Sequence, residues 1–159
     1  MTDFARLLAA LADAEVEFIV IGGFAATAHG SAHVTVDLDV VYARNPANMS
    51  RLSRGLEPFE PYLRGAPPGL PFRFDVPTIE RGLNFTLRTT SGDLDVFGEA
   101  TGGGTYEALL PHTERRLVFG RETLIVDLET LIRLKRAAGR PRDLDRIAEL
   151  EAIAEERDG

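Results

Sequence analysis

Repeated aspartate pairs are the residues of this chain best suited to chemistry. The tripeptide Asp-Leu-Asp occurs three times, at residues 37–39, 93–95 and 143–145. The first two copies lie in strand-like runs, where side chains at i and i+2 project from one face about 6.5 to 7 Å apart. Two carboxylates at that spacing can reach around divalent metal ions, which points to phosphate chemistry. The third copy is predicted to be helical, where i and i+2 face in different directions, so we expect Asp143 and Asp145 to be structural.

The aspartates of the first two copies could form one metal site. Asp37 and Asp39 are the obvious first pair, and strand parity offers Asp95, or else Asp93, as a third ligand. Carboxylates arranged in this way can hold two Mg²⁺ ions about 3.5 to 4 Å apart. One ion lowers the pKa of an attacking hydroxyl and the other neutralises a leaving pyrophosphate. Catalysis at such a site consists mainly of positioning and charge stabilisation.

A glycine pair stands upstream of the first aspartate pair. Gly22 and Gly23 follow the apolar run 18–21 and lead into the alanine-rich segment 24–29. A helix that begins without side-chain bulk presents backbone N–H groups and a partial positive charge to a phosphate. An isolated aspartate pair could be a solvated strand face. The order of elements in this chain instead favours a metal site that binds phosphate: a strand is followed by a glycine pair, a helix and a strand that bears aspartates.

Hydrophobic periodicity predicts the elements around these residues. Helices are expected over residues 4–14, 24–29, 46–56, 128–138 and 141–156. Strands are expected over residues 18–21, 34–41, 84–90, 93–98 and 124–126, with Val34, Val36, Leu38 and Val40 on one face of the second strand. The proline-rich segment 57–82 is expected to be a loop or lid with little regular structure.

These elements predict a small α/β (α+β) protein with a short mixed β-sheet backed by helices. A core domain is expected over residues 1–127. The C-terminal helical pair, residues 128–159, is expected to form an appendage packed on the same domain.

Two basic residues are candidates for contacts at the site. If Ser91 and Gly92 form a two-residue hairpin turn, Arg88 lies directly across from Asp95 and could orient its carboxylate. Lys135 borders the apolar face of its predicted helix. A lysine in that position either contacts a nucleotide phosphate or an active-site carboxylate, or lays its stem on the core with a solvated ammonium group.

The composition of the chain excludes several classes of protein. The chain has 159 residues, of which 44% are hydrophobic, so it can form one domain with a real core. It has no apolar run long enough to span a bilayer, and its first residues lack the basic-then-apolar order of a secretory signal, so we expect a cytoplasmic protein without a membrane partner. It contains no cysteine, which excludes thiolate metal sites and disulfides. Its net charge of −7 argues against binding of duplex DNA.

The motif order resembles that of a known enzyme superfamily. The chain resembles the signature of nucleotidyltransferases with the polymerase beta-like fold. The segment that carries this resemblance is Ile21-Gly22-Gly23, followed by thirteen residues and then Asp37-Leu38-Asp39. The segments 35–40, 92–95 and 134–144 look like those of small bacterial members related to abortive-infection and toxin–antitoxin nucleotidyltransferases. The resemblance covers about residues 16 to 150.

The resemblance implies metal-dependent transfer of a nucleoside monophosphate from an NTP to a hydroxyl acceptor, with release of pyrophosphate. The implied acceptor is a tRNA 3′ end or the side chain of a partner protein, in a toxin–antitoxin or phage-defence setting with a possible cognate partner protein. An alternative enzyme of the same layout would modify a hydroxyl group of an antibiotic. A catalytically degenerate, nucleotide-binding regulatory module is the non-enzymatic alternative.

The resemblance also assigns roles to residues. It implies two Mg²⁺ ions and the following site residues: Asp37, Asp39 and Asp95 as catalytic metal ligands, and Gly22, Gly23 and Lys135 as contacts of the NTP. Asp95 is selected over Asp93 because the third acid in these relatives follows a Gly-x-hydrophobic step. The chain departs from the pattern at His33, where many relatives carry arginine, so the triphosphate or acceptor contact made there would have to be supplied in another way.

Overall fold

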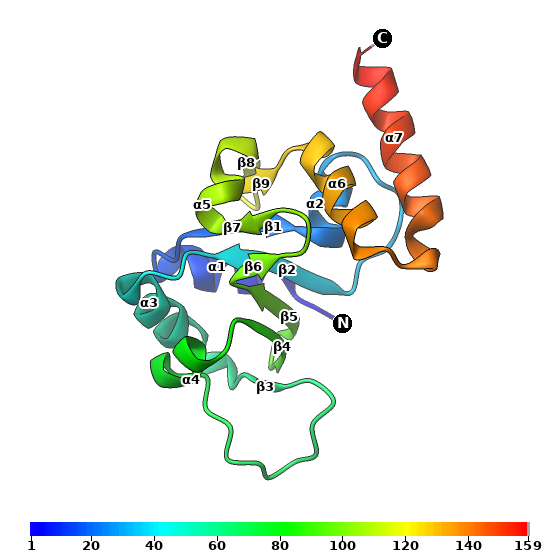
Figure 1. Cartoon of the computed structure of the whole chain (residues 1–159). Helices are drawn as coiled ribbons and strands as arrows, with labels where there is room; N and C mark the ends of the chain where they lie inside the picture. Colours follow the sequence, from blue (N-terminus) through cyan, green and yellow to red (C-terminus); the bar gives the residue numbers. More distant parts are fainter. Residues whose placement is uncertain (159) are drawn as a thin grey trace.

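The computed structural model describes residues 1–158, apart from the side chain of residue 142, and shows a mixed sheet flanked by helices (Figure 1). The main sheet has seven strands in the order β3-β4-β5-β2-β1-β9-β8. These strands are β1 (Phe18–Ile21), β2 (Asp37–Tyr42), β3 (Tyr62–Leu63), β4 (Asn84–Thr89), β5 (Gly92–Phe97), β8 (Thr113–Val118) and β9 (Arg121–Val126). The pairs β2–β5 and β1–β9 are parallel, and the other neighbours are antiparallel. A separate two-stranded ladder joins β6 (Glu99–Ala100) to β7 (Gly104–Thr105).

The helices agree well with the sequence pattern. They are α1 (Phe4–Asp13), α2 (Gly22–Ala28), α3 (Pro46–Leu56), α4 (Val76–Arg81), α5 (Tyr106–Leu109), α6 (Leu128–Ala138) and α7 (Leu144–Asp158), with 3-10 turns at Glu57–Phe59, Leu110–His112 and Pro141–Asp143. Side chains cap several of them, as when Asn45 accepts a hydrogen bond from the backbone N–H of Asn48 at 2.9 Å. Gly139 ends α6 in the left-handed region, at φ 65°. The expected α/β class, with a mixed sheet backed by helices, is confirmed. Among the described helices, none has the length and apolar character needed to cross a bilayer.

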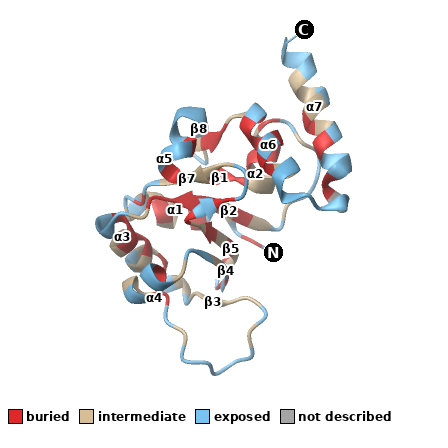
Figure 2. Cartoon of the chain, viewed as in Figure 1, coloured by how far each residue is buried: buried red, intermediate tan, exposed pale blue. Residues whose placement is uncertain are grey.

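Strand alternation separates the core from the face that carries the aspartates. Leu38 and Val40 of β2 are fully buried, as are Leu94 and Val96 of β5 and Leu87 of β4. They join one cluster with apolar residues of α1, α3 and the neighbouring strands. Figure 2 shows buried residues concentrated in the sheet and the helices beside it, whereas the loop between β3 and α4 is exposed or half-buried except at Phe74. The intervening residues of β2 and β5, which include the aspartates, must therefore face away from this cluster.

The predicted strand 34–41 begins later than expected. Strand β2 starts at Asp37, and Val34 and Val36 are 84% and 65% exposed instead of lying on the apolar face. Both neighbours of β2 explain this start, because the pairing with β1 stops at Asp39 and the pairing with β5 begins at Asp37. Residues 34–36 therefore have no strand to pair with.

The hairpin between β4 and β5 has a different register from the predicted one. Thr89 pairs with Gly92, so the turn is formed by Thr90 and Ser91, one residue earlier than expected. Gly92 is held as the first residue of β5 by its φ of 113° and by close packing, since a Cβ there would lie 2.4 Å from the Cα of Thr2. The prediction that Arg88 lies opposite Asp95 is wrong, because Arg88 pairs with Asp93.

The segment 57–82 is more ordered than its prolines indicate. It contains a 3-10 turn, strand β3 at the edge of the main sheet and helix α4, so the prediction of little regular structure is wrong for these parts. Prolines are compatible with this order because Pro58 and Pro77 lie in the first turns of the 3-10 turn and of α4, where no backbone N–H is needed. Strand β8 and the short helix α5 carried no strong periodic signal and are further additions to the predicted elements.

Candidate metal and nucleotide site

Three aspartates from two neighbouring strands meet at one place. The parallel register of β2 and β5 sets Asp39 beside Asp95 and Asp37 beside Asp93, all on the face away from the apolar core. One carboxylate oxygen each from Asp37, Asp39 and Asp95 lies within 4.8 Å of the others. A divalent cation prefers such a set of oxygen ligands. Asp93 points to the same face but is not a member of this group.

The negative charges of this cluster are only partly balanced by the surrounding protein. Burial, followed by the negative charges of Asp95 and Asp37, raises the pKa of Asp39 to about 8. Burial also raises the pKa of Asp95, although the guanidinium of Arg64 opposes that change. The Oδ1 atom of Asp39 is buried and has no hydrogen-bond partner among the described residues. A buried carboxylate oxygen without a partner, close to two further carboxylates, fits a bound metal ion well.

The glycine pair is packed tightly against the strand that carries the aspartates. Gly22 has a φ of 68°, and a Cβ at this position would lie 2.2 Å from Oδ2 of Asp39. A Cβ on Gly23 would lie 2.5 Å from Oγ1 of Thr35. The two glycines form the first turn of α2 instead of preceding it, and no side chain caps that helix. The chain thus uses glycine here because a larger residue would displace the Asp39 carboxylate.

Helix α6 brings Lys135 to the same place. Lys135 lines two adjoining clefts, of about 340 and 320 Å³, and Asp37, Asp39 and Arg140 also line both of them. Burial lowers the pKa of Lys135, while the charge of Asp143 acts in the opposite direction. The structure therefore brings the predicted lysine to the carboxylates.

The two clefts differ in character. The first is basic, because Arg146 joins Lys135 and Arg140 there, and it also contains Gly23 and His33. The second combines carboxylates with an apolar wall. Its lining residues are Ile21, Gly22, Asp37, Asp39, Asp95, Phe97, Ala100, Thr101, Leu131, Leu134, Lys135, Ala138, Arg140 and Asp143.

His33 is tied to the last helix. Its Nδ1 lies 2.9 Å from Oε1 of Glu149, whose other oxygen accepts a hydrogen bond from the backbone N–H of Ala32 at 3.0 Å. The hydroxyl of Ser31 also donates to Glu149, and these bonds together lower the pKa of Glu149 to about 2, the Ser31 hydroxyl making the largest contribution. His33, where the chain departs from the pattern of the nucleotidyltransferases that it resembles, thus helps to attach the loop before β2 to α7.

Several residues of the site are not evident from the sequence. Arg64 lies beside the carboxylates, with its Nη2 2.5 Å from Oδ1 of Asp95. Asp143, which the sequence predicts to be structural, has a side chain that is only 2% exposed, accepts a hydrogen bond from Arg140 Nε at 3.1 Å and also lines the second cleft. No short-range sequence pattern singles out Asp143, because α6 ends between it and Lys135. Nothing in the proline-rich segment singles out Arg64 either.

The comparison with solved structures identifies the fold. No protein-family model matches the chain, and no curated protein matches its sequence. Among solved structures, it is similar to a solution structure of the antibiotic-resistance factor ANT(2″)-Ia, with 16% identity and a TM-score of 0.57 over 97% of this chain and 81% of the other. A crystal structure of ANT(2″)-Ia in complex with adenylyl-2″-tobramycin gives 15% identity and a TM-score of 0.56 over 97% of this chain and 86% of the other. The likeness in structure and the order of its elements show that the chain has the polymerase beta-like nucleotidyltransferase fold.

Proposed function

We propose that this protein transfers a nucleoside monophosphate from an NTP to a hydroxyl acceptor. The observation that carries the proposal is the meeting of Asp37, Asp39 and Asp95 within 4.8 Å, beside a cleft lined by basic residues. In the reaction the acceptor hydroxyl loses its proton, its oxygen bonds to the α-phosphorus, and the bond from that phosphorus to the pyrophosphate breaks. Bound Mg²⁺ would supply charge neutralisation and a lower pKa for the hydroxyl.

Each group of residues has its own part in this proposal. Asp37 and Asp39 would hold the metal ions, and Asp95 would bind the catalytic one and face the acceptor. The triphosphate lies in the basic cleft, where Lys135, Arg140 and Arg146 offset its charge. Gly22 and Gly23 leave room for the phosphates next to Asp39. Because Lys135 comes from α6, residues 128–159 would act as an appendage that completes the site of a core domain over residues 1–127.

The acceptor would enter by the second cleft, where Asp95 lies beside the apolar wall. A tRNA 3′ end or a partner protein is the first candidate, on the family resemblance. A small molecule with hydroxyl groups is the second. It is favoured by the similarity to ANT(2″)-Ia, one structure of which contains adenylyl-2″-tobramycin. Asp143 would give this cleft a carboxylate able to accept hydrogen bonds from an acceptor of either kind.

The test is transfer of label from each α-³²P-labelled NTP, with Mg²⁺, to tRNA, to co-purified proteins and to aminoglycosides. We expect one class of acceptor to be labelled, and the doubly substituted Asp37→Asn/Asp39→Asn protein to lose at least about 100-fold in rate. Asp145→Asn is the matched control, because it alters the exposed aspartate of the third Asp-Leu-Asp copy. Labelling that persists in the double variant would remove these carboxylates from the chemistry.

A binding module without catalysis is the competing outcome. Its supporting observation is His33, which is bonded to Glu149 where many relatives have an arginine. Calorimetry with a non-hydrolysable NTP analogue distinguishes the two. Mg²⁺-dependent binding together with no turnover on any acceptor class would favour the module over the enzyme.

A further inference from the structure

Arg64 occupies a defined place in the sheet beside the carboxylates. It directly follows β3, and its backbone N–H donates to the carbonyl oxygen of Thr86 at 3.0 Å, which continues the pairing of β3 with β4. Thr86 pairs with Asp95, and Asp95 with Asp39. Residues 64, 86, 95 and 39 therefore form one row across four strands, and the short side chain of Thr86 leaves space for the guanidinium above it.

The guanidinium group reaches three carboxylates. Its Nη2 donates to Oδ1 of Asp95 at 2.5 Å and to the carbonyl oxygen of Leu87 at 2.9 Å. Its Nε lies 3.4 Å from Oδ1 of Asp93, and its Nη1 lies 3.9 Å from Oδ2 of Asp37. Among the side chains that the structure describes, Arg64 is the one cation within 4 Å of these carboxylates. An arginine stays charged throughout the physiological range.

We propose that Arg64 is the positioning residue of the third metal ligand and the internal counter-ion of the acidic cluster. This inference rests on the proposed function. By holding Oδ1 of Asp95, Arg64 fixes the carboxylate and leaves Oδ2 for a metal ion. Its positive charge offsets repulsion between the carboxylates in the metal-free protein, and the same charge opposes the entry of divalent cations.

These two roles predict that one substitution raises the metal affinity and lowers the catalytic rate. Arg64→Met keeps the length of the side chain but removes its charge and hydrogen bonds. Metal affinity should rise about 3- to 10-fold, because a positive charge close to the cation has been removed. The rate kcat should fall about 10- to 100-fold with little change in the KM for NTP, because Asp95 is no longer fixed. If Arg64 had a purely structural role, its removal would lower both the metal affinity and kcat.

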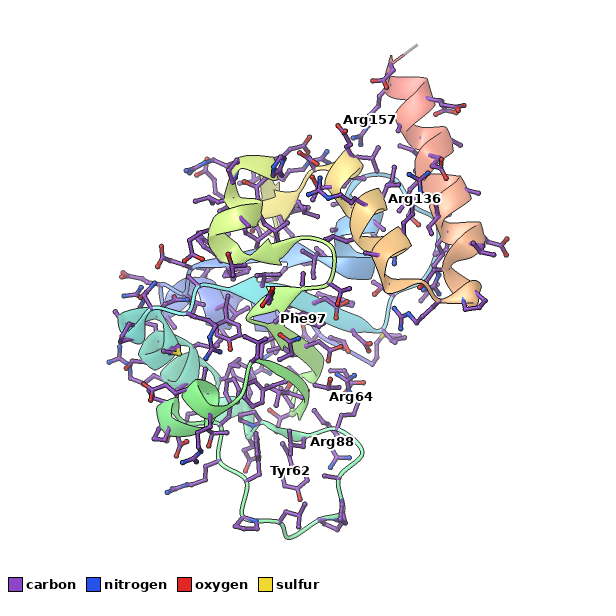
Figure 3. All side chains as sticks on the ribbon, in the orientation of Figure 1. Tyr62, Arg64, Arg88, Phe97, Arg136 and Arg157 are labelled. Atoms are coloured by element: carbon purple, nitrogen blue, oxygen red, sulfur yellow. The ribbon has the colours of Figure 1, made fainter. Side chains whose placement is uncertain are left out.

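Arg88 offers a matched control. It lies on β4 in the adjacent row, opposite Asp93 and Tyr62, and Figure 3 shows it close to Arg64 near the base of the long loop. It is exposed and forms no ion pair within 4 Å with any side chain that the structure describes. Arg88→Met removes the same charge from the same face without touching the Asp95 carboxylate.

The experiment measures Mn²⁺ binding by the loss of the free-ion EPR signal, thermal unfolding without metal, and steady-state kinetics. Wild type, Arg64→Met, Arg64→Lys, Arg88→Met and Asp39→Asn are compared. We expect tighter Mn²⁺ binding and lower metal-free stability for Arg64→Met, values near wild type for Arg88→Met, and wild-type Mn²⁺ affinity with partly restored kcat for Arg64→Lys.

The outcomes separate the two proposals. If Arg64→Met binds Mn²⁺ no more tightly than wild type, or if Arg88→Met has the same effect, the role of Arg64 is disproved. If Arg64→Met is too unstable to measure, Arg64→Lys decides, since loss of Mn²⁺ binding in that charged variant contradicts the counter-ion role. Wild type that binds Mn²⁺ no better than Asp39→Asn would instead disprove the metal site and the proposed function.

Discussion

Gly22 shows how closely the backbone of one residue and the carboxylate of another are fitted. Its positive φ is one reason for glycine, and the crowding of a Cβ, which would lie 2.2 Å from Oδ2 of Asp39, is a second and separate reason. Gly65 has a similar φ, of 82°, but a Cβ there would meet nothing within 4 Å. The two positions therefore allow backbone strain to be separated from crowding of the metal ligand.

We predict that Gly22→Ala lowers the free energy of unfolding by about 2 to 4 kcal/mol, as the sum of backbone strain and overpacking. Gly65→Ala should cost only about 1 kcal/mol, from strain alone. Urea unfolding measures both values, and Mn²⁺ titration should show weaker binding for Gly22→Ala only. Equal costs for the two variants would mean that the carboxylate moves freely and that the fit at Gly22 is unimportant.

At the scale of elements, a buried histidine joins three parts of the fold. His29 ends α2, its side chain is buried, and its Nε2 lies 2.8 Å from the carbonyl oxygen of Val126 at the end of β9. Its Nδ1 faces two guanidinium groups, from Arg116 of β8 at 3.4 Å and Arg157 of α7 at 3.2 Å. Because arginine only donates, Nδ1 must accept and the proton lies on Nε2. The neutral ring thus holds α7 to the sheet.

The pH dependence of stability should reveal this histidine. Burial, followed by the charges of Arg116 and Arg157 and opposed by the bond to Val126, lowers the pKa of His29 below 6.5. Below pH 6.5 the unfolded chain therefore binds more protons than the folded one. The contribution of His29 to the free energy of unfolding is complete above pH 6.5 and is lost as the pH falls through the pKa of His29 in the folded state.

We predict that the Tm of wild type falls more between pH 7.5 and 5.5 than the Tm of His29→Gln. His112→Gln, at an exposed histidine, should follow wild type. Comparison of variants is needed because the raised pKa of Asp39 contributes in the opposite direction over the same range. Parallel Tm curves for wild type and His29→Gln would contradict the assignment.

At the scale of the whole molecule, the site lies where the sheet meets the C-terminal helices. The sheet supplies the carboxylates and α2 supplies the glycines. The basic residues come from α6, from the turn that follows it and from α7. Helix α6 packs against both α2 and α7 (Figure 1), so the basic residues of the C-terminal region lie next to the helix that begins with the glycine pair. The resulting concentration of charge weakens the metal-free fold, because three carboxylates are kept close together without a full set of partners.

We predict that Asp39→Asn stabilises the metal-free protein by about 1 to 3 kcal/mol, since it removes a buried charge whose ionisation is disfavoured. Ten millimolar Mg²⁺ should raise the Tm of wild type and leave the Tm of the variant unchanged. Differential scanning calorimetry with and without Mg²⁺ measures both effects. A variant that is less stable than wild type without metal would show that the Asp39 carboxylate contributes favourable contacts to the apo fold.

The elements and the carboxylate pairs could be predicted because they depend on local signals. Period-3.6 and period-2 patterns, Asn45 before Pro46 and Gly139 after α6 act within a few residues. The glycine pair before an aspartate-bearing strand is likewise a short-range motif. The choice between Asp93 and Asp95 was open on parity alone, because both face the same side of β5.

Tertiary structure decided which distant side chains meet. The register of the β4–β5 hairpin depends on the packing of Gly92 against Thr2, which is far away in the sequence. As a result, Arg88 pairs with Asp93 and not with Asp95 as the sequence predicted. Arg64 reaches the carboxylates because a two-residue edge strand, too short to have a pattern, pairs with β4. Asp143 is buried because α7 packs on α6. Such contacts arise from long-range pairing and packing, so residue types and their spacing could locate the acidic pairs but not their cationic partners.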